Sequence, residues 1–231
     1  MKQIKKFELL FFLFLLLCQN KVSGQAYRME AGLTAGRSFY MGDSNPSALF
    51  QNDKPSWGLL YRYNLNGRFS LKANATVSGI SGTTLDKINE YPDGEAFQFD
   101  RNVLDAGVQL ELNFYEYGMP AYLPGSSRIS PYVSLGIGMT GYKAEKKKVC
   151  ANIPFGVGVK IKALPRLNVG CEWNMRMTFA DDLDYSDYGG NFQLSDPWLV
   201  SSAGNKNNDW YSMLMLYVSY DLYDVGSKCF K

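Results

Sequence analysis

The sequence predicts an all-β fold, an eight-stranded antiparallel up-and-down transmembrane β-barrel, and three observations support this prediction. Residues 166–179, RLNVGCEWNMRMTF, alternate apolar and polar side chains without a break. Seven other segments repeat the alternation, and their connections alternate between long and mostly shorter ones. Because side chains of a strand point to opposite faces with period two, each segment has one apolar and one polar side. Such strands are typical of a barrel wall whose apolar face contacts lipid and whose polar face lines the interior.

Residues 1–24 are expected to be a secretory signal peptide, which leaves residues 25–231 as the barrel. Three lysines precede an apolar run at residues 9–17, and small and polar residues lead up to Gly24. The run would span only about half of a hydrocarbon core roughly 30 Å thick, so we expect cleavage after Gly24 rather than a membrane anchor. The leucines before Cys18 disfavour a lipidation site.

Strands one to three are expected at residues 26–36, 56–64 and 69–78. The stretch between the first two is rich in Gly, Asp, Asn and Pro, which predicts a long loop. Asn66 and Gly67 predict a tight hairpin turn before strand three, because both residues tolerate positive φ angles. The apolar faces comprise Tyr27, Met29, Ala31, Leu33 and Ala35, then Trp57, Leu59, Tyr61 and Tyr63, then Phe69, Leu71, Ala73, Ala75 and Val77.

Strands four to six are expected at residues 104–114, 133–142 and 155–162, after a polar connection at residues 79–102. Residues 143–152 contain a run of three lysines, which predicts a solvated loop; contact with lipopolysaccharide phosphates is the alternative. The apolar faces comprise Leu104, Ala106, Val108, Leu110, Leu112 and Phe114, then Val133, Leu135, Ile137 and Met139, then Phe155, Val157, Val159 and Ile161.

Strands seven and eight are expected at residues 166–179 and 210–223. Residues 180–209, between them, form the longest predicted loop and are rich in Asp, Gly, Asn and Ser. The faces of strand eight are less distinct, since apolar and aromatic residues occupy both: Tyr211, Met213, Met215 and Tyr217 interleave with Leu214, Leu216 and Val218.

Long connections follow strands one, three, five and seven, which places them at one end of the barrel, as in outer-membrane barrels with long outer loops and short periplasmic turns. The connection at residues 115–130 is too long for a plain periplasmic turn. It is therefore a candidate contact surface for a periplasmic partner, with the following residues: Tyr115, Glu116, Tyr117, Met119, Tyr122 and Leu123.

The polar faces carry a charged set that should line the interior. Eight strands enclose a space that side chains roughly fill, and buried charges have to pair or be hydrated. We therefore expect a salt-bridged plug, with ion conduction as the alternative. The set contains six cations and five anions: Arg28, Glu30, Arg62, Lys72, Asp105, Glu111, Lys160, Lys162, Glu172, Arg176 and Asp221.

Alternation alone does not say which face points outward, so a soluble lipocalin-like barrel with an apolar interior is the competing architecture. Three features favour the membrane barrel: uncharged apolar faces, aromatic residues near strand ends, and the unequal connections. The Gly-x-Trp motif typical of lipocalins is also absent from the first strand.

The composition argues against an enzyme. The chain has no histidine, which removes Ser-His-Asp triads, histidine acid–base catalysis and most catalytic zinc sites. The acidic run Asp181, Asp182, Asp184 and Asp187 lacks the glycine and final glutamate of a calcium loop, so we expect no metal site and no cofactor. Cys150, Cys171 and Cys229 predict no disulfide framework, and the near-balanced charge gives no sign of a nucleic-acid partner.

Four phrases resemble the PorG-like family of Bacteroidota outer-membrane barrels, which belongs to the type IX secretion system. They are YRYNLN at 61–66, LELNFYEY at 110–117, SPYVSLGIG at 130–138 and CEWNMRMTFADDLD at 171–184. The last phrase is the most specific, and the resemblance extends over most of the mature chain. The segments at 37–54 and 185–209 match only loosely.

The resemblance implies an outer-membrane barrel that associates with the periplasmic ring of the secretion machine, formed by a ring lipoprotein and its partner. Such a barrel would tether or position the ring and so support protein secretion. The alternatives are a general small outer-membrane barrel with adhesive or membrane-stabilising outer loops, and a soluble carrier of lipophilic ligands with reversed faces.

Overall fold

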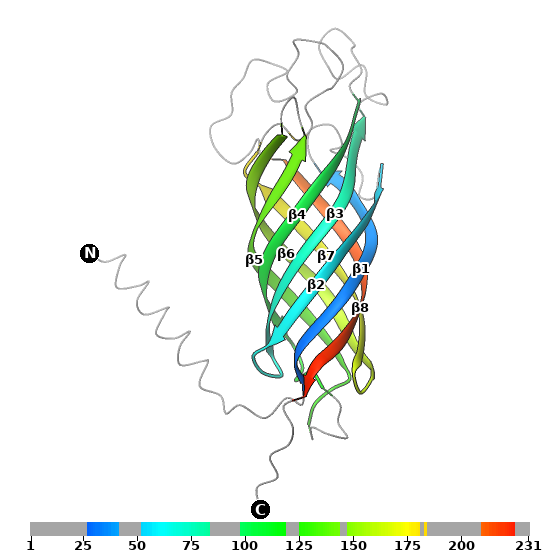
Figure 1. Cartoon of the computed structure of the whole chain (residues 1–231), viewed down its shortest axis with the longest axis vertical. Helices are drawn as coiled ribbons and strands as arrows, with labels where there is room; N and C mark the ends of the chain where they lie inside the picture. Colours follow the sequence, from blue (N-terminus) through cyan, green and yellow to red (C-terminus); the bar gives the residue numbers. More distant parts are fainter. Residues whose placement is uncertain are drawn as a thin grey trace, which may run out of the picture.

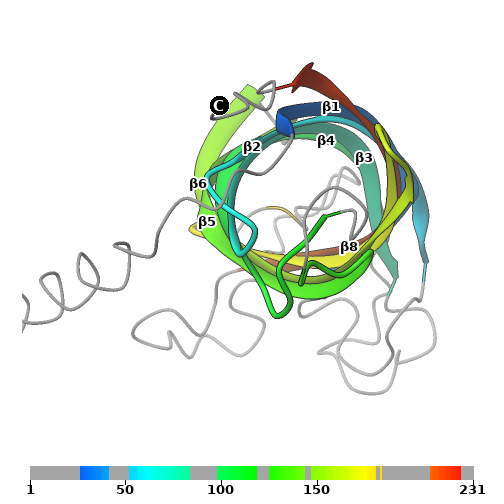
Figure 2. The same ribbon diagram turned by 90° about the horizontal axis from the view of Figure 1, so that it is seen from below.

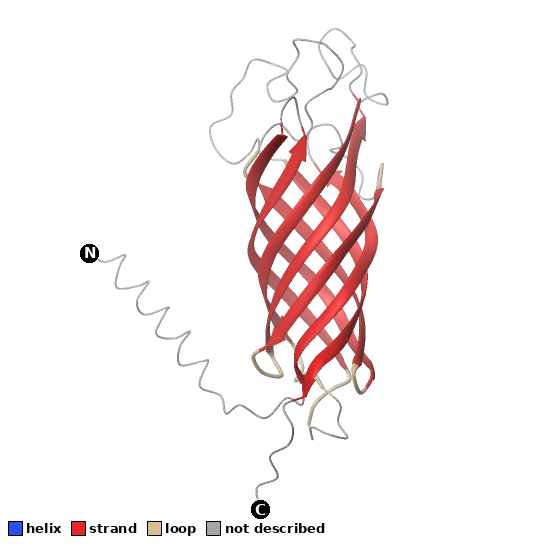
Figure 3. Cartoon of the chain, viewed as in Figure 1, coloured by secondary structure: helices blue, strands red, loops and turns tan. Residues whose placement is uncertain are grey.

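The described part of the chain is an all-β structure (Figures 1 and 3). The computed structural model describes residues 27–41, 52–83, 98–118, 125–143, 147–180, 183 and 209–224. These residues form eight strands: β1 (Tyr27–Met41), β2 (Lys54–Asn64), β3 (Phe69–Thr83), β4 (Gln98–Asn113), β5 (Ile129–Lys143), β6 (Lys147–Leu164), β7 (Leu167–Thr178) and β8 (Trp210–Asp224). Within these ranges, no helix is long and apolar enough to cross a membrane.

The eight strands form a closed antiparallel barrel in chain order, which confirms the predicted up-and-down topology. Each strand pairs with the next, and β1 pairs with β8 to complete the ring (Figure 2). Closure leaves no unpaired sheet edge, which is the condition for a β-structure to cross the hydrocarbon core of a membrane.

The apolar faces point outward, as predicted for a membrane barrel. Leu33, Trp57 and Ile137 are 66%, 65% and 75% exposed, whereas the charged side chains between the apolar positions are buried inside. An apolar exterior all around a barrel suits lipid and is unfavourable in water. The lipocalin-like alternative, which needs an apolar interior throughout, does not fit this arrangement.

Strands β1 and β3 extend further than the sequence predicts. Residues 38–41 were expected in a loop but pair with residues 210–213 of β8. Residues 79–83 likewise pair with residues 98–102 of β4. These stretches lack a clean alternation because the interior they face at this end is partly apolar, so the pattern did not distinguish them from loops.

Strand β6 also begins earlier than predicted. The lysine run was expected in a long solvated loop at residues 143–152, but Lys147 and Lys148 pair with Lys143 and Tyr142 of β5. The β5–β6 connection therefore consists of residues 144–146 only. The lysine run suggested a loop because it is strongly charged. Backbone pairing at the exposed end of a barrel, however, tolerates any side chain.

The β2–β3 turn lies where predicted, but its mechanism differs. Among the described residues, only Asn52 and Gly125 have positive φ angles, so Asn66 and Gly67 do not adopt the positive φ angles that were expected of them. Instead, Asn66 Oδ1 accepts hydrogen bonds from the backbone N–H groups of Arg68 (2.8 Å) and Phe69 (2.7 Å). Asparagine side chains commonly stabilise turns in this way.

The two ends of the barrel differ and are named here by their connections. The turn end contains residues 65–68, 114–118, 125–128 and 165–166, together with the start of β1 and the end of β8 (bottom of Figure 1). At the loop end lie the strand ends that the other four connections join, and the β7–β8 connection has the most residues of the four.

The interior near the loop end holds an apolar and aromatic cluster, so the prediction of a polar interior holds for only part of the barrel. In β8, Tyr211, Met213, Met215 and Tyr217 are buried and point inward, which resolves the ambiguous faces of that strand. The cluster comprises Tyr40, Ile80, Phe99, Val103, Tyr142, Leu183, Tyr211, Met213 and Met215.

Candidate functional site in the barrel interior

Six charged side chains meet inside the half of the barrel nearer the turn end. This central network takes one residue from each of six strands: Glu30 (β1), Arg62 (β2), Lys72 (β3), Glu111 (β4), Lys160 (β6) and Glu172 (β7). Arg62 links two of the carboxylates: its Nη1 lies 2.7 Å from Glu30 Oε2 and its Nη2 lies 3.1 Å from Glu111 Oε1. Three cations and three anions thus form one neutral network.

The network crosses the barrel from wall to wall. Lys72 on β3 contacts Glu172 on β7, with 2.5 Å between Nζ and Oε1. Lys160 Nζ lies 2.8 Å from Glu111 Oε2 and 4.7 Å from the ring centroid of Tyr132. The Tyr132 hydroxyl donates to Glu172. Ion pairs and rings therefore occupy this cross-section of the barrel.

A second group fills the interior at the turn end. Lys162 pairs with Asp221, and Asp221 Oδ1 also accepts a hydrogen bond from Asn168 Nδ2 over 2.9 Å. The Tyr117 hydroxyl donates to Asn168 Oδ1 over 2.8 Å, and its ring lies 5.4 Å from Lys160 Nζ. Burial raises the pKa of Tyr117 well above its ordinary value, so the phenol stays neutral and can donate.

A third group lies toward the loop end, around Asp105 of β4. The Asp105 carboxylate accepts three hydrogen bonds: from Arg176 Nε over 3.1 Å, from Asn152 Nδ2 over 2.8 Å and from the Tyr211 hydroxyl over 2.9 Å. All four side chains are buried. A buried carboxylate with this many donors is held in a single position, which fixes β4, β6, β7 and β8 relative to one another.

The predicted interior set is placed inside the barrel with one exception. Arg28 is exposed, because an irregularity in the β1–β8 pairing between Tyr27 and Glu30 interrupts the alternation. Its predicted interior position is wrong. The remaining set has equal numbers of each sign: cations Arg62, Lys72, Lys160, Lys162 and Arg176, and anions Glu30, Asp105, Glu111, Glu172 and Asp221.

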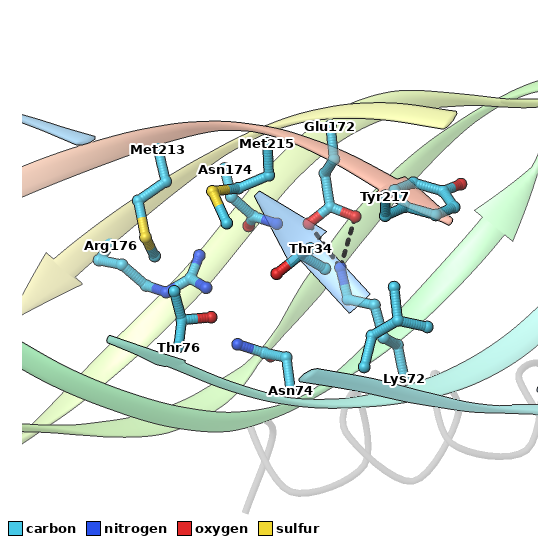
Figure 4. A pocket seen from close by; sticks show the side chains of 11 residues that line it. Thr34, Lys72, Asn74, Thr76, Glu172, Asn174, Arg176, Met213, Met215 and Tyr217 are labelled. Atoms are coloured by element: carbon cyan, nitrogen blue, oxygen red, sulfur yellow. Dashed lines mark hydrogen bonds and ion pairs between the residues drawn. The ribbon is translucent and has the colours of Figure 1, made fainter. Parts of the chain in front are cut away.

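A cavity of about 30 Å³ separates the central network from the Asp105 group (Figure 4). Lys72 and Glu172 line one side, and Arg176 lines the other. Arg176 Nη1, Thr34 Oγ1 and Asn74 Oδ1 have no hydrogen-bond partner among the described residues. The space is large enough to hold water, which could satisfy these donors and acceptors. A small compartment between layers of ion pairs is a poor path for ions.

The β4–β5 connection is divided between a buried and an exposed part. Tyr117, predicted as a partner contact, is 1% exposed because its ring enters the barrel, so its predicted role is wrong. Tyr115 is 59% exposed, and Glu116 is exposed beside Arg68. Both remain accessible to a partner. Met119, Tyr122 and Leu123 lie outside the described residues.

Comparison with protein families gives one match. A family model described as a domain of unknown function (DUF6089) matches residues 7–231. The chain belongs to the DUF6089 family. No sequence among the curated proteins matches this DUF6089 protein.

The DUF6089 barrel is similar in architecture to several solved outer-membrane proteins. Neisserial surface protein A has 11% identity and a TM-score of 0.47, with 86% of this chain and 98% of that chain covered. Ail of Yersinia pestis, in complex with the heparin analogue sucrose octasulfate, has 10% identity and a TM-score of 0.43, with 84% and 98% covered. OprG of Pseudomonas aeruginosa has 9% identity and a TM-score of 0.41, with 87% and 100% covered. At these values the similarity concerns the barrel architecture alone.

Two buried charges at the loop end of the DUF6089 barrel were not predicted. Arg101 donates to the backbone oxygen of Leu183 over 2.8 Å, and Asp209 accepts from the Leu183 backbone N–H over 2.9 Å. Tyr40 also donates to Asp209. Arg101 and Asp209 lie in stretches that were assigned to loops from their composition, and no local sequence signal could have placed their side chains inside the barrel. They hold the start and the end of the β7–β8 connection on the apolar cluster.

The remaining chemical candidates do not form a site in the described structure. Within its ranges, no group of three or more His, Cys, Asp or Glu residues could hold a metal ion. Of the acidic run after β7, Asp181, Asp182, Asp184 and Asp187 lie outside the described residues. Cys171 carries a free thiol, and Cys229 lies outside the described residues.

Proposed function

We propose that this protein is a non-enzymatic outer-membrane barrel that tethers or positions the periplasmic ring of a type IX secretion machine, as a PorG-like component. The sequence phrases described above carry the resemblance to that family. The single structural observation that supports the tether is a sealed barrel with an exposed connection at its turn end. A sealed interior is unsuitable for transport, and an exposed connection is accessible to a partner.

The seal is built from described contacts at three levels. The central network spans six strands, Tyr117 fills the turn end, and Leu183 is buried in the cluster at the loop end. Opening a path would require separating buried ion pairs, and losing one partner of such a pair is strongly unfavourable. Function is therefore better sought on the outside of the barrel than in its lumen.

The exposed part of the turn end is a compact surface around residues 114–116. Phe114 and Tyr115 are 52% and 59% exposed, and Glu116 lies 4.0 Å from Arg68 of the neighbouring turn. Tyr117 N–H donates to Gly67 O over 2.9 Å, which attaches this segment to the β2–β3 turn. Exposed aromatic residues on a well-held segment are suited to bind a protein partner.

Replacing Tyr115 and Glu116 tests the tether. In cells that carry the secretion system, the double variant Tyr115→Ala/Glu116→Lys should lower recovery of ring components with the barrel at least tenfold. The reason is that it removes the exposed aromatic contact and reverses a charge while leaving Tyr117 in the interior. The barrel would carry a tag in the β7–β8 connection, and co-purified proteins would be identified after extraction from outer membranes in mild detergent.

The matched control likewise replaces one aromatic and one acidic residue, at the other end. Phe179 and Asp100 are exposed at the loop end, so Phe179→Ala/Asp100→Lys should leave ring recovery within about twofold of the wild type. Gel mobility before and after heating would show whether each barrel is folded. Full ring recovery with the turn-end variant would refute the proposed contact, and absence of ring components with the wild type would refute the tether.

A general small outer-membrane barrel is the second candidate, favoured by the unequal ends. The β3–β4 and β7–β8 connections both lie at the loop end, where they would face the cell exterior. If adhesion were the role, shortening residues 185–208 would reduce surface attachment and the turn-end variant would not. Periplasmic recovery without detergent would instead indicate a soluble carrier.

A further inference from the structure

Two lysines face each other at the loop end of the β5–β6 hairpin. Lys143 and Lys147 are register partners in the antiparallel ladder, and both are exposed. Two residues further down each strand, on the same face, Gly141 pairs with Val149, which is 71% exposed. The two lysines therefore stand on the outer face of the barrel. Directly opposite side chains have Cβ atoms about 5 Å apart.

Within the described structure, this lysine pair has no acidic partner of its own. Like charges directly opposite each other destabilise a strand pair. Two other exposed cations at the loop end have acidic partners: Arg37 lies 3.3 Å from Asp53, and Lys54 lies 2.5 Å from Asp100. Among the described residues, no carboxylate forms an ion pair with Lys143 or Lys147. Residues 143–148 contain four lysines and one glutamate, a net charge of 4 − 1 = +3.

The pair stands at the edge of the apolar outer face. Val149 lies in the next row toward the barrel centre, and Met139, which is 60% exposed, lies in the row below it. Phe179, 50% exposed, is attached to the same region through its N–H, which donates to Ala151 O over 3.0 Å. Lysines at this height extend into the headgroup layer while their methylene groups cover apolar surface. The anion available there is a lipid phosphate.

We propose that Lys143 and Lys147 bind a phosphate group of the outer-leaflet lipid, in the outer membrane a lipid A phosphate of lipopolysaccharide. A phosphate between two opposed ammonium groups accepts hydrogen bonds from both and offsets their repulsion. The site would anchor one lipid against the β5–β6 wall and hold the barrel at a set depth. This inference rests on the proposed outer-membrane location and is independent of the tether.

The test measures lipid binding to the purified full-length barrel in detergent by native mass spectrometry. The probes are bisphosphorylated lipid A and the same lipid with both phosphates removed. We expect wild type to bind the phosphorylated form at least tenfold more tightly. The variant Lys143→Gln/Lys147→Gln should lose that preference, and Lys143→Arg/Lys147→Arg should keep it, because arginine retains the charge and binds phosphate well.

A matched control removes two cations that already have acidic partners. Arg37→Gln/Lys54→Gln carries the same change in net charge at the same end and should bind phosphorylated lipid A within about twofold of the wild type. An equal loss in this control would show that only bulk charge matters and would overturn the site. So would equal binding of both lipids by the wild type. Displacement of the lipid by inorganic phosphate at equal concentration would show that a free anion is the ligand.

The tether proposal and the lipid-site proposal can be refuted independently of each other. Lys143→Gln/Lys147→Gln lies at the loop end and should still recover ring components from outer membranes. Loss of ring components in every variant and in the wild type would refute the tether without affecting the lipid measurement, which uses the isolated barrel.

Discussion

Replacing Glu111 by glutamine is expected to lower the free energy of unfolding by about 3–5 kcal/mol, because it leaves buried cations without their shared anion. Glu111 is fully buried and lies 2.8 Å from Lys160 Nζ and 3.7 Å from Lys72 Nζ, and it also accepts from Arg62. The variant would change the neutral central network to a net charge of +1. Denaturant unfolding in detergent micelles, followed by tryptophan fluorescence, measures the loss.

Two further variants separate network charge from general damage. Glu116→Gln removes a carboxylate from an exposed pair with Arg68 and should change the unfolding free energy by less than about 0.5 kcal/mol. Glu111→Gln combined with Lys160→Met restores neutrality and should recover part of the stability. If Glu111→Gln alone proved as stable as the wild type, the interior would be hydrated and the proposed seal would be wrong.

Replacing Gly158 by valine should destabilise the barrel by about 3 kcal/mol, because an inward side chain cannot be accommodated there. A Cβ at Gly158 would lie 2.5 Å from Cζ of Tyr132, its register partner on β5. Tyr132 cannot simply rotate away, since it is buried, donates to Glu172 and packs against Lys160. The same unfolding measurement reports the effect.

A glycine on the outer face of β5 serves as the control. Around Gly141 the nearest atom to an added Cβ would be 3.7 Å away, so Gly141→Val should change stability by less than about 0.5 kcal/mol. In a Tyr132→Ala background, Gly158→Val should cost less than half as much as in the wild type, because the clashing ring is gone. An unchanged cost in that background would mean that strand pairing, and not the ring, requires glycine.

Much of the wall was predictable from local pattern. In β7, residues 167–178 alternate cleanly, and Glu172, Asn174 and Arg176 are all inside as expected. The alternation of side chains in a strand is a property of its backbone, so it can be recognised in the sequence without knowing which strand lies beside it. Arg28 shows the limit of this rule, because the irregular β1–β8 pairing beside it interrupts the alternation and leaves its side chain exposed.

The site was predictable as a set of charges but not as a network. Nothing local indicates that Lys72 meets Glu172 across the barrel, or that Arg62 lies between Glu30 and Glu111. Such contacts depend on strand tilt and on the register that closes the ring, both of which are set by all eight strands together. The buried position of Tyr117 also depends on the closed barrel, because its ring occupies space that the interior side chains leave at the turn end.

The sequence by itself determined the number and order of the strands, the division of most strands into an apolar and a polar face, and the near-neutral charge of the polar face, because side-chain alternation and composition are local. The tertiary structure alone decided where strands end, which charges pair and how both ends are sealed. Residues 38–41 are strand because β8 lies beside them, and Asp209 is buried because Leu183 and Tyr40 lie over it. Those outcomes require closure of the barrel, which brings together residues far apart in the chain.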